Sequence, residues 1–304
     1  MKDKILLLLS SDNYVSGQSI CDSLGISRTA VWKAVQALRE EGYQIEAVPN
    51  RGYRLLESPD LLTSGEISRY LTGSWAGKCL EAYDTIPYST NLRVKQLAEA
   101  GSPEGTLVVA DVQQGGRGRR GRGWYEAPAG SSIAMSLLLR PHCTPQHASM
   151  LTLVAALAVR AGISDAASLA ALIKWPNDIV ADGRKLCGIL TEMTLEENEM
   201  QYLIVGIGIN VNNRDFPPEI AERASSLRLI TGRPVRRAAL VGAVLKRFEE
   251  YYAVFCRSED LSGLKEEYNR ILAGLHETVR VLSPAGDWEG ISLGITDEGA
   301  LQVE

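Results

Sequence analysis

The sequence is poor in the residues that build metal sites, disulfide frameworks and membrane anchors. Its five cysteines are scattered without a CxxC pair, and its three histidines lie near no acidic or cysteine cluster. This spacing argues against a structural zinc site and a disulfide framework, so we assign no metal-ligating residues. The apolar residues 5–9 are followed by a polar stretch, and no other run reaches 18 apolar residues. We therefore expect no signal peptide, no membrane partner and a location in the reducing cytoplasm.

An excess of basic residues is also absent. Lysine and arginine together number 32 against 37 acidic residues, which gives a net charge of -5 and a pI near 5.5. This balance argues against a protein that coats nucleic acid through bulk charge, although a local basic face is compatible with it. The 304 residues, 45% of them hydrophobic, are enough for two or three domains of an ordinary globular protein.

Residues 1–58 show the order of elements of a winged helix-turn-helix. Helices are predicted at residues 2–10, 16–24 and 27–41, and two strands at residues 43–48 and 53–56. Ser27 can N-cap the third helix, which has one apolar face. The polar face of that helix and the tip of the hairpin supply the predicted DNA contacts, which are Arg28, Thr29, Lys33 and Arg51. Docking or dimerisation is the alternative role for such a unit.

After a linker at residues 58–60, longer apolar strands alternate with helices. Strands are predicted at residues 107–112, 132–139, 171–175, 185–194 and 202–211, and helices at residues 90–101, 145–161 and 236–252. From residue 276 onward, the short alternating segments 278–282, 288–295 and 300–303 are typical of a small barrel. We predict an α+β protein with domains at residues 1–60, 65–272 and 275–304.

The segment from residue 113 to residue 124 holds four arginines and five glycines. Glycine lets the backbone approach a ligand closely and adopt a positive φ. Arginine presents forked donors to carboxylate and phosphate oxygens and keeps its charge. We interpret the segment as a mobile loop that closes over an anionic intermediate. The alternative is a solvated RNA-binding tract, which the short, single segment between predicted strands disfavours.

Three further segments contain residues that suit a ligand site. Lys174-Trp175-Pro176-Asn177-Asp178 precedes Lys185, whose ammonium group could lie against a bound anion. The same stretch is consistent with a surface hairpin turning at Asp182-Gly183, and both interpretations can hold. Ser89-Thr90-Asn91 begins a predicted helix and could hydrogen-bond a neutral polar ligand. The glycines of Gly206-Ile207-Gly208-Ile209-Asn210 allow close packing within a strand.

These segments occur in the order found in biotin protein ligases. The chain resembles that family in Ser89-Thr90-Asn91, in the Gly-Arg-Gly-Arg-Arg-Gly-Arg loop, in Lys-Trp-Pro-Asn-Asp, in Arg-Lys-Leu-x-Gly-Ile-Leu and in Gly-Ile-Gly-Ile-Asn. The resemblance covers nearly the whole chain, and the joint match is highly specific although each motif alone is weak. Together with the N-terminal unit, it is similar to the bifunctional form, a biotin ligase and biotin operon repressor.

The resemblance implies a fold and a set of ligand contacts. The fold would be a winged helix-turn-helix, a ligase domain related to class II synthetases and a C-terminal SH3-like barrel. The implied biotin-binding residues are Ser89, Thr90, Asn91, Gln113, Arg117, Gly118, Arg119, Lys185 and Gly188. The implied adenylate-binding residues are Arg120, Arg122 and Asn210. The implied catalytic residues are Arg119, Lys185 and Asp178, and Asp178 would help arrange a metal or the incoming lysine.

The resemblance also implies substrates and partners. Biotin and ATP, with Mg²⁺, would form biotinyl-5'-AMP, and the biotinyl group would pass to a lysine of the biotin carboxyl carrier protein. Cations must offset the charge at the α-phosphate, for which Arg117, Arg119 and Lys185 are the candidates. A homodimer would bind operator DNA of biotin genes when the adenylate is present. A lipoate ligase of the same fold and a non-catalytic, ligand-sensing transcription factor are the alternatives.

Overall fold

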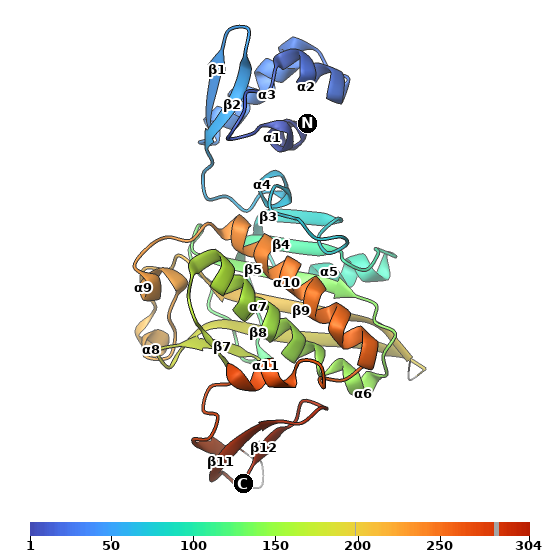
Figure 1. Cartoon of the computed structure of the whole chain (residues 1–304), viewed down its shortest axis with the longest axis vertical. Coiled ribbons are helices and arrows are strands. Elements are labelled where there is room, and N and C mark those ends of the chain that lie inside the picture. The colour runs from blue at the N-terminus through green and yellow to red at the C-terminus, as the bar shows by residue number, and fades with distance from the viewer. Residues whose placement is uncertain (198, 283–285) are drawn as a thin grey trace.

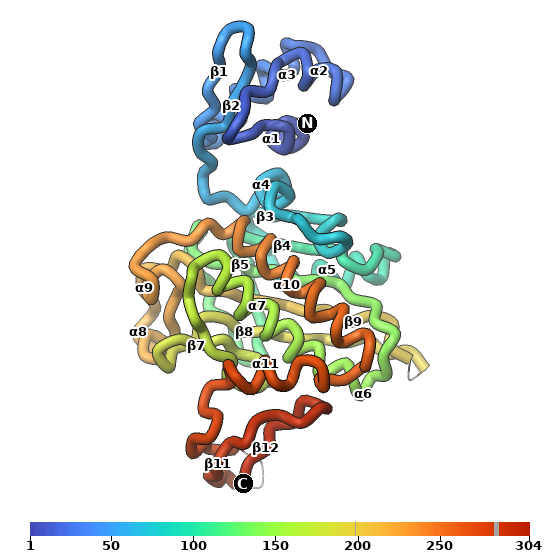
Figure 2. Tube along the Cα trace, viewed as in Figure 1, coloured from blue at the N-terminus to red at the C-terminus, as the bar shows by residue number. Residues whose placement is uncertain are grey.

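The computed structural model describes residues 1–197, 199–282 and 286–304 of the chain. An N-terminal unit lies at one end of the long axis, the C-terminal strands lie at the other, and a large sheet with its helices lies between them (Figure 1). The path of the chain in Figure 2 runs from the N-terminal unit through the sheet to the C-terminal strands. The order of the units in the sequence is therefore also their order in space.

The N-terminal unit has the predicted winged helix-turn-helix order. Its elements are α1 (Lys2–Leu8), α2 (Gly17–Leu24), α3 (Arg28–Glu40), β1 (Gln44–Val48) and β2 (Gly52–Glu57). Ser16 and Ser27 cap α2 and α3 by accepting hydrogen bonds from first-turn N–H groups, and Gly25 ends α2 with a left-handed φ of 65°. All five elements contribute apolar side chains to one cluster, so this unit has a core of its own.

The central sheet is mixed, as predicted. Its seven strands follow the order β3-β4-β5-β9-β8-β7-β6, and only β3 and β4 are parallel neighbours among the described strands. The strands are β3 (Leu80–Ile86), β4 (Leu107–Gln113), β5 (Ser132–Leu139), β6 (Leu172–Lys174), β7 (Asp178–Ala181), β8 (Arg184–Glu196) and β9 (Glu199–Asn210). The long hairpin of β8 and β9 extends beyond the body of the sheet (Figure 1).

Helices cover both faces of this sheet. The long helices α7 (Leu151–Ala167) and α10 (Arg237–Ser258) lie side by side on one face (Figure 1), and α5 (Thr90–Glu99) packs on the other through Val94 and Ala98. Gly162 lets the long helices approach closely, because a Cβ there would lie 2.8 Å from the backbone nitrogen of Val244. The short helices are α4 (Ser64–Ser68), α6 (Pro145–Ala148), α8 (Pro218–Ala221), α9 (Leu227–Thr231), α11 (Lys265–Arg270) and the 3-10 helix η1 (Arg119–Gly121).

One helical stretch, Pro145–Ala167, is long and apolar enough to cross a membrane by length and composition alone. However, 72% of its most apolar window is buried inside the protein, where α7 packs against α10 and the sheet. A core helix of a soluble protein passes the same test of length and hydropathy, so this stretch supports no membrane-spanning role.

The structure corrects several predicted boundaries. The helix predicted at residues 145–161 is divided into α6 and α7, and α7 continues to Ala167 because Gly162 is a helix-packing residue and not a stop signal. The helix predicted at residues 236–252 continues to Ser258. Strands β3 and β7 were not predicted, since β7 has only four residues and β3 lacks a clear alternation of buried and exposed positions.

The C-terminal strands form an antiparallel sheet. β10 (Thr278–Val281), β11 (Trp288–Ile295) and β12 (Leu301–Val303) follow the order β10-β11-β12, which confirms the predicted strands. The predicted SH3-like barrel is not confirmed as closed, because within residues 276–282 and 286–304 these strands pair in an open order. The sheet is attached to the central unit, since the Trp175 Nε1–H group donates to the Gly299 carbonyl at 3.0 Å.

A buried arginine fixes the linker against the sheet. Arg237, the first residue of α10, is 0% exposed and forms ion pairs with Asp60 of the linker and Asp111 of β4. It also donates to the carbonyl oxygens of Asp60 and Ser132. A buried charge is tolerated only when it is paired and hydrogen-bonded, so these contacts hold the chain where it leaves the N-terminal unit.

Candidate active site

A cavity of ≈ 1300 Å³ lies where the predicted segments meet. Its walls come from the first turn of α5, the end of β4, the loop that follows β4, and strands β8 and β9. Val279 and Leu301 of the C-terminal strands also line it. Pockets for single small ligands usually measure roughly 300–1,000 Å³, so this cavity has room for an extended ligand.

One end of the cavity is lined by neutral hydrogen-bonding side chains, beside the carboxylate of Glu192. Ser89 N-caps α5 by accepting a hydrogen bond from the Leu92 N–H group at 3.3 Å. The next two residues, Thr90 and Asn91, are 3% and 7% exposed and turn toward the sheet. The Thr90 N–H group donates to Gln113 Oε1 at 3.1 Å. The start of α5 and the end of β4 therefore place these polar groups together.

The glycine-arginine loop folds back on itself beside the cavity. The Gly118 N–H group donates to the Arg122 carbonyl at 2.6 Å, and Arg117 and Gly123 form a β-bridge. Arg120 takes a left-handed φ of 57° in the turn between them. Local backbone contacts thus define the loop, as its glycine content allows.

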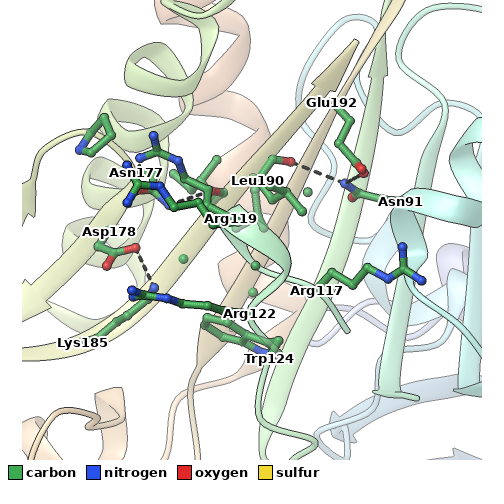
Figure 3. A pocket seen from close by; sticks show the side chains of 18 of the residues that line it. Asn91, Arg117, Arg119, Arg122, Trp124, Asn177, Asp178, Lys185, Leu190 and Glu192 are labelled. Atoms are coloured by element: carbon green, nitrogen blue, oxygen red, sulfur yellow. Dashed lines mark hydrogen bonds and ion pairs between the residues drawn. The ribbon is translucent and has the colours of Figure 1, made fainter. Parts of the chain in front are cut away.

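The arginine side chains of this loop spread over different parts of the cavity. All four are exposed, and Arg119 donates to Asn177 Oδ1 at 3.0 Å. In Figure 3, Arg117 extends on the side where Asn91 lies, whereas Arg122 extends toward Lys185. The loop therefore supplies cations along the cavity and not at one point.

Lys185 forms an ion pair at the cavity wall. Its Nζ atom lies 2.6 Å from Asp178 Oδ1 and 5.4 Å from the centroid of the Trp124 ring (Figure 3). The hairpin of β7 and β8 sets this geometry, because Asp182 and Gly183 adopt left-handed φ values of 50° and 71° at its turn. The predicted hairpin is confirmed, and it brings the predicted lysine and aspartate together.

Trp124 forms part of the cavity wall and was given no role from the sequence. A Cβ at Gly188 would lie 2.7 Å from Trp124 Cζ3, and a Cβ at Gly208 would lie 2.7 Å from Trp124 Cε2. The two glycines therefore allow the indole to lie against β8 and β9. Gly188 was predicted to allow close approach of biotin, and in this structure the nearest neighbours of its missing side chain include Trp124 and Lys185.

Twelve of the predicted ligand contacts line the cavity. They are Ser89, Thr90, Asn91, Gln113, Arg117, Gly118, Arg119, Arg120, Arg122, Asp178, Lys185 and Gly188. Asn210 is not among the lining residues. It is 5% exposed, and its Nδ2 group donates to the Ser225 carbonyl at 3.1 Å. These contacts give Asn210 a packing role beside the cavity, and its contact with an adenylate stays a prediction.

The predicted DNA contacts lie on the N-terminal unit. Arg28, Thr29 and Lys33 are exposed on α3, and Arg51 is exposed in the turn between β1 and β2. The Arg51 guanidinium lies 4.4 Å from the centroid of the Tyr14 ring. A second cavity of ≈ 520 Å³ is lined by Arg28 and Arg51 together with the start of α2. All four side chains are thus exposed on the N-terminal unit, and their contact with DNA stays a prediction.

Comparison with known proteins connects this geometry to a family. Residues 84–210 match the Biotin/lipoate A/B protein ligase family, and residues 2–54 match an HTH domain. The Bifunctional ligase/repressor BirA of Bacillus subtilis (strain 168) is 42% identical over 306 residues, which covers 100% of this chain and 93% of that protein. This chain belongs to the family of bifunctional ligase/repressors.

Other members and structures agree with this assignment. The Bifunctional ligase/repressor BirA of Escherichia coli (strain K12) is 28% identical over 301 residues, covering 99% of this chain and 91% of that protein. The structure of a biotin protein ligase from Aquifex aeolicus in complex with biotin and ATP is 33% identical, with a TM-score of 0.64, and covers 74% of this chain and 91% of that chain. The ligase-family match contains the predicted cavity contacts, and the HTH match contains the predicted DNA contacts.

Sequence reasoning missed several residues that this ligase/repressor places at or behind the cavity. Glu192 and Asn177 line it, and Ser136 lies behind Thr90 and Asn91. Asn177 belongs to the Lys-Trp-Pro-Asn-Asp motif, so the motif could have suggested it. Ser136 and Glu192 occupy ordinary positions in apolar strands, and no local signal distinguishes them.

Proposed function

We propose that the chain activates biotin with ATP to biotinyl-5'-AMP and transfers the biotinyl group to a specific lysine of the biotin carboxyl carrier protein. It also represses biotin genes when the adenylate is bound, as a bifunctional ligase/repressor. The observation that carries the proposal is one cavity that joins neutral hydrogen-bonding groups to a set of arginines and Lys185. Such a cavity fits a ligand with a neutral polar ring and an anionic tail.

The two ends of the cavity divide the ligand between them. Thr90 and Gln113 offer hydrogen bonds to the ureido ring of biotin, and Asn91 lines the same end of the cavity. The arginines of the loop and Lys185 offset the negative charge of the biotin carboxylate and of the α-phosphate that it attacks. Arg119 and Lys185 are the proposed catalytic residues for this first step. Arg120 and Arg122 are proposed to hold the adenylate.

The second step needs no nucleophilic side chain from the protein. A neutral lysine amine of the acceptor attacks the acyl carbon of the mixed anhydride, the C–O bond to phosphate breaks, and AMP leaves. We propose that Asp178, once released from its ion pair with Lys185, orients the incoming amine or accepts its proton. Cys187 lies beside Gly188, but burial raises the pKa of its thiol, so it stays protonated.

Mg²⁺ enters the proposal with ATP. The described residues hold no group of three His, Cys, Asp or Glu side chains that could bind a metal, whereas Asp178 offers a carboxylate at the cavity. Mg²⁺ is commonly held by one or two carboxylates and substrate phosphates, which fits this arrangement. When bound, the ion would neutralise charge on the phosphates during pyrophosphate release.

Further parts of the proposal concern assembly and place in the cell. We propose a homodimer that binds operator DNA through Arg28, Thr29, Lys33 and Arg51. We also propose a cytoplasmic location, which is supported by five free cysteines, two of them exposed. Residues 1–60, 65–272 and 275–304 are the proposed domains.

The test is a pyrophosphate-release assay on the purified full-length chain. With ATP and Mg²⁺, we expect release with biotin and none without an acid. The matched comparison supplies lipoate in place of biotin. Pyrophosphate release with lipoate and not with biotin would overturn the assignment of biotin. Radiolabelled biotin and a cell lysate should then label a single carrier protein. Release without any labelled acceptor would contradict the transfer step.

A further inference from the structure

A chain of hydrogen bonds runs behind the polar end of the cavity. Asn91 Nδ2 donates to Glu192 Oε2 at 2.5 Å and to the Leu190 carbonyl at 3.4 Å. The Ser136 hydroxyl donates to Asn91 Oδ1 at 2.6 Å, and the Ser136 and Thr90 hydroxyl oxygens lie 2.7 Å apart. The chain thus starts on β8, passes through α5 and β5, and ends at Thr90 on the cavity wall.

The donor and the acceptor of every hydrogen bond in this chain of contacts follow from its first member, Glu192. A carboxylate and a carbonyl oxygen can only accept, so the Asn91 amide must present its nitrogen to Glu192 and Leu190. Asn91 Oδ1 then faces Ser136 and takes its only hydroxyl proton. The 2.7 Å contact between Ser136 and Thr90 is left with Thr90 as the donor, and it is much shorter than the 3.5 Å contact of the same hydroxyl with Gln113 Oε1. The Thr90 oxygen therefore turns lone pairs, and not its proton, toward a ligand.

Gln113 has a fixed orientation as well. Its Oε1 accepts from the Thr90 N–H group at 3.1 Å, which turns its Nε2 donors away from Thr90. That nitrogen lies next to Gly116, where a Cβ would approach it to 2.8 Å, and Gln113 itself lines the cavity. The site thus shows an acceptor at Thr90 and a donor at Gln113. A cyclic urea has the matching set, an N–H donor beside a carbonyl acceptor.

We infer that Glu192 and Ser136 are positioning residues that set the hydrogen-bond polarity of this site and thereby select a cyclic urea. The inference rests on the proposed function, because it takes biotin as the ligand. Ser136 is 0% exposed and does not line the cavity, so it acts only through Thr90 and Asn91. Glu192 is exposed to the cavity and shares the Asn91 amide with Leu190.

The backbone of β9 also accommodates this chain of hydrogen bonds. A Cβ at Gly206 would lie 2.2 Å from Asn91 Oδ1, closer than real contacts allow. Glycine at this position therefore keeps Asn91 in the orientation that receives the Ser136 proton. The predicted motif Gly206-Ile207-Gly208 thus has one glycine for Asn91 and one for Trp124.

Ser136→Ala is the sharpest test, because it removes the middle member of the chain of hydrogen bonds. Without Ser136 as acceptor, the Thr90 hydroxyl can rotate and present its proton to the ligand, since only the long 3.5 Å contact with Gln113 Oε1 opposes the rotation. We expect the KM for biotin to rise about tenfold, the loss of one hydrogen bond, with little change in the KM for ATP. Ser132→Ala is the matched control, since Ser132 is buried on the same strand and contacts Asn213 instead. An equal rise in the control would show a general effect of strand packing and overturn the inference.

A ligand analogue separates polarity from packing. In a cyclic carbamate analogue of biotin, one ureido N–H is replaced by oxygen, which accepts and cannot donate. For each of the two regioisomers, the KM is compared with that for biotin. The wild-type chain should disfavour one of them about tenfold, and Ser136→Ala should lose most of this preference. The same preference in both proteins would overturn the inference.

Glu192 gives an independent test on an exposed side chain. Glu192→Met should raise the KM for biotin about threefold, less than Ser136→Ala, because the Leu190 carbonyl still holds Asn91. Glu192→Gln keeps an accepting oxygen and should behave like the wild type. A Glu192→Met variant with the wild-type KM for biotin would show that Glu192 does not position Asn91, and it would overturn the inference. If the wild-type chain itself released no pyrophosphate with biotin, the proposed function would fail, which is a different outcome.

Discussion

At the scale of single residues, the ion pair between Lys185 and Asp178 decides how the site can work. The two charges lie 2.6 Å apart, and their side chains are 34% and 26% exposed. A pair this open to water is weak, so a dense anion such as a phosphate can compete for the lysine. Binding of the adenylate would then release Asp178 for the acceptor lysine.

Lys185→Ala should weaken adenylate formation without unfolding the protein. The loss of a charge-assisted hydrogen bond amounts to about 1.5–3 kcal/mol, or roughly ten- to a hundred-fold in rate or affinity. Pyrophosphate release at saturating ATP measures it. Lys265→Ala is a matched control, because Lys265 forms an ion pair of the same length with Asp297 outside the cavity. Wild-type release by the Lys185 variant would show that the assignment of this lysine is wrong.

Arg119→Gly should let the adenylate escape. Arg119 is the loop arginine that donates to Asn177, which lies across the cavity on the segment before β7. Without this contact the loop closes less firmly, and biotinyl-AMP reaches solvent. We expect biotin labelling of bystander proteins to rise at least about tenfold, since one charged hydrogen bond is lost. The measurement is biotinylation of added albumin, and labelling that stays restricted to the carrier protein would contradict a containment role.

Some site residues follow from the sequence and others do not, for a physical reason. Asp178 was assigned from the family resemblance and Lys185 from its place after the Asp182-Gly183 turn, and the local hairpin brings the two together. The contacts of Ser136 with Thr90 and Asn91 join β5 to α5, which are far apart in the sequence. Such contacts depend on sheet order and register, which local pattern does not determine.

At the scale of elements, the predictions succeeded where one periodicity governs a whole element. β5 occupies the predicted residues, and α3 begins after the predicted cap Ser27. Predictions failed where packing overrides local signals. Gly162 suggests a helix end, but α7 continues through it because α10 packs there. The short strand β7 has a regular place in the sheet because it pairs with β8 on one side and with β6 on the other.

The loop at residues 115–123 should be mobile without ligand and ordered with biotinyl-AMP. Its glycines make fixing it entropically costly, and its four arginines repel one another until an anion arrives. Hydrogen exchange of the loop amides should slow about tenfold or more when the ligand is bound, which corresponds to a closing free energy of about 1.4 kcal/mol. Amides of β5 provide the internal reference. Equally slow exchange in both states would contradict the predicted closure.

A carboxylate on α10 holds the segment before β3 and should make stability depend on pH. Burial alone raises the pKa of Glu249, but hydrogen bonds from Ser74, Trp75 and Ala76 outweigh it and hold the pKa below its usual range. Because folding lowers this pKa, the carboxylate stabilises the protein at pH values above its unfolded-state pKa, which is near 4.3. The stabilisation is lost as the pH falls through the folded-state pKa.

Glu249→Gln should therefore destabilise the protein at pH 7 by about 1–2 kcal/mol, the scale of hydrogen bonds to a charged group that is partly exposed. The difference from the wild type should shrink below roughly pH 4, where the wild-type carboxyl is protonated as well. Denaturant unfolding at pH 7 and pH 3.5 measures both. Glu250→Gln changes the neighbouring carboxylate, which pairs with Arg247 instead, and should show a smaller effect. A difference that persists unchanged at pH 3.5 would exclude this electrostatic origin.

At the scale of the whole molecule, the ligase cavity and the N-terminal unit are joined by a short polar path. Asp111 lies near the end of β4, two residues before Gln113, and it also accepts from the Gly130 N–H group just beyond the loop. Arg237 bridges Asp111 to Asp60, which lies in the linker to the N-terminal unit. A change in the loop could thus alter the position of the linker, which supports a coupling between adenylate binding and DNA binding.

The chain should bind operator DNA more tightly when it carries the adenylate. The exposed residues Arg28, Thr29, Lys33 and Arg51 give one N-terminal unit only a few contacts, so a symmetric dimer on two half-sites is the expected binding form. The adenylate orders the loop, and an ordered loop can offer a surface for the second copy. Coupling free energies between sites are typically about 1–3 kcal/mol, which predicts a gain in affinity of roughly 5- to 150-fold.

A gel-shift titration with the upstream DNA of the chain's own biotin genes tests this expectation, with biotin and ATP present or absent. Arg28→Ala should weaken binding in both states while adenylate formation stays at the wild-type level, because α3 lies in a different unit from the cavity. Equal affinity with and without ligand would refute the co-repressor role. If no shift occurs in either state at low salt, the N-terminal unit is a docking module. A shift of equal size with unrelated DNA would show charge-driven binding without an operator.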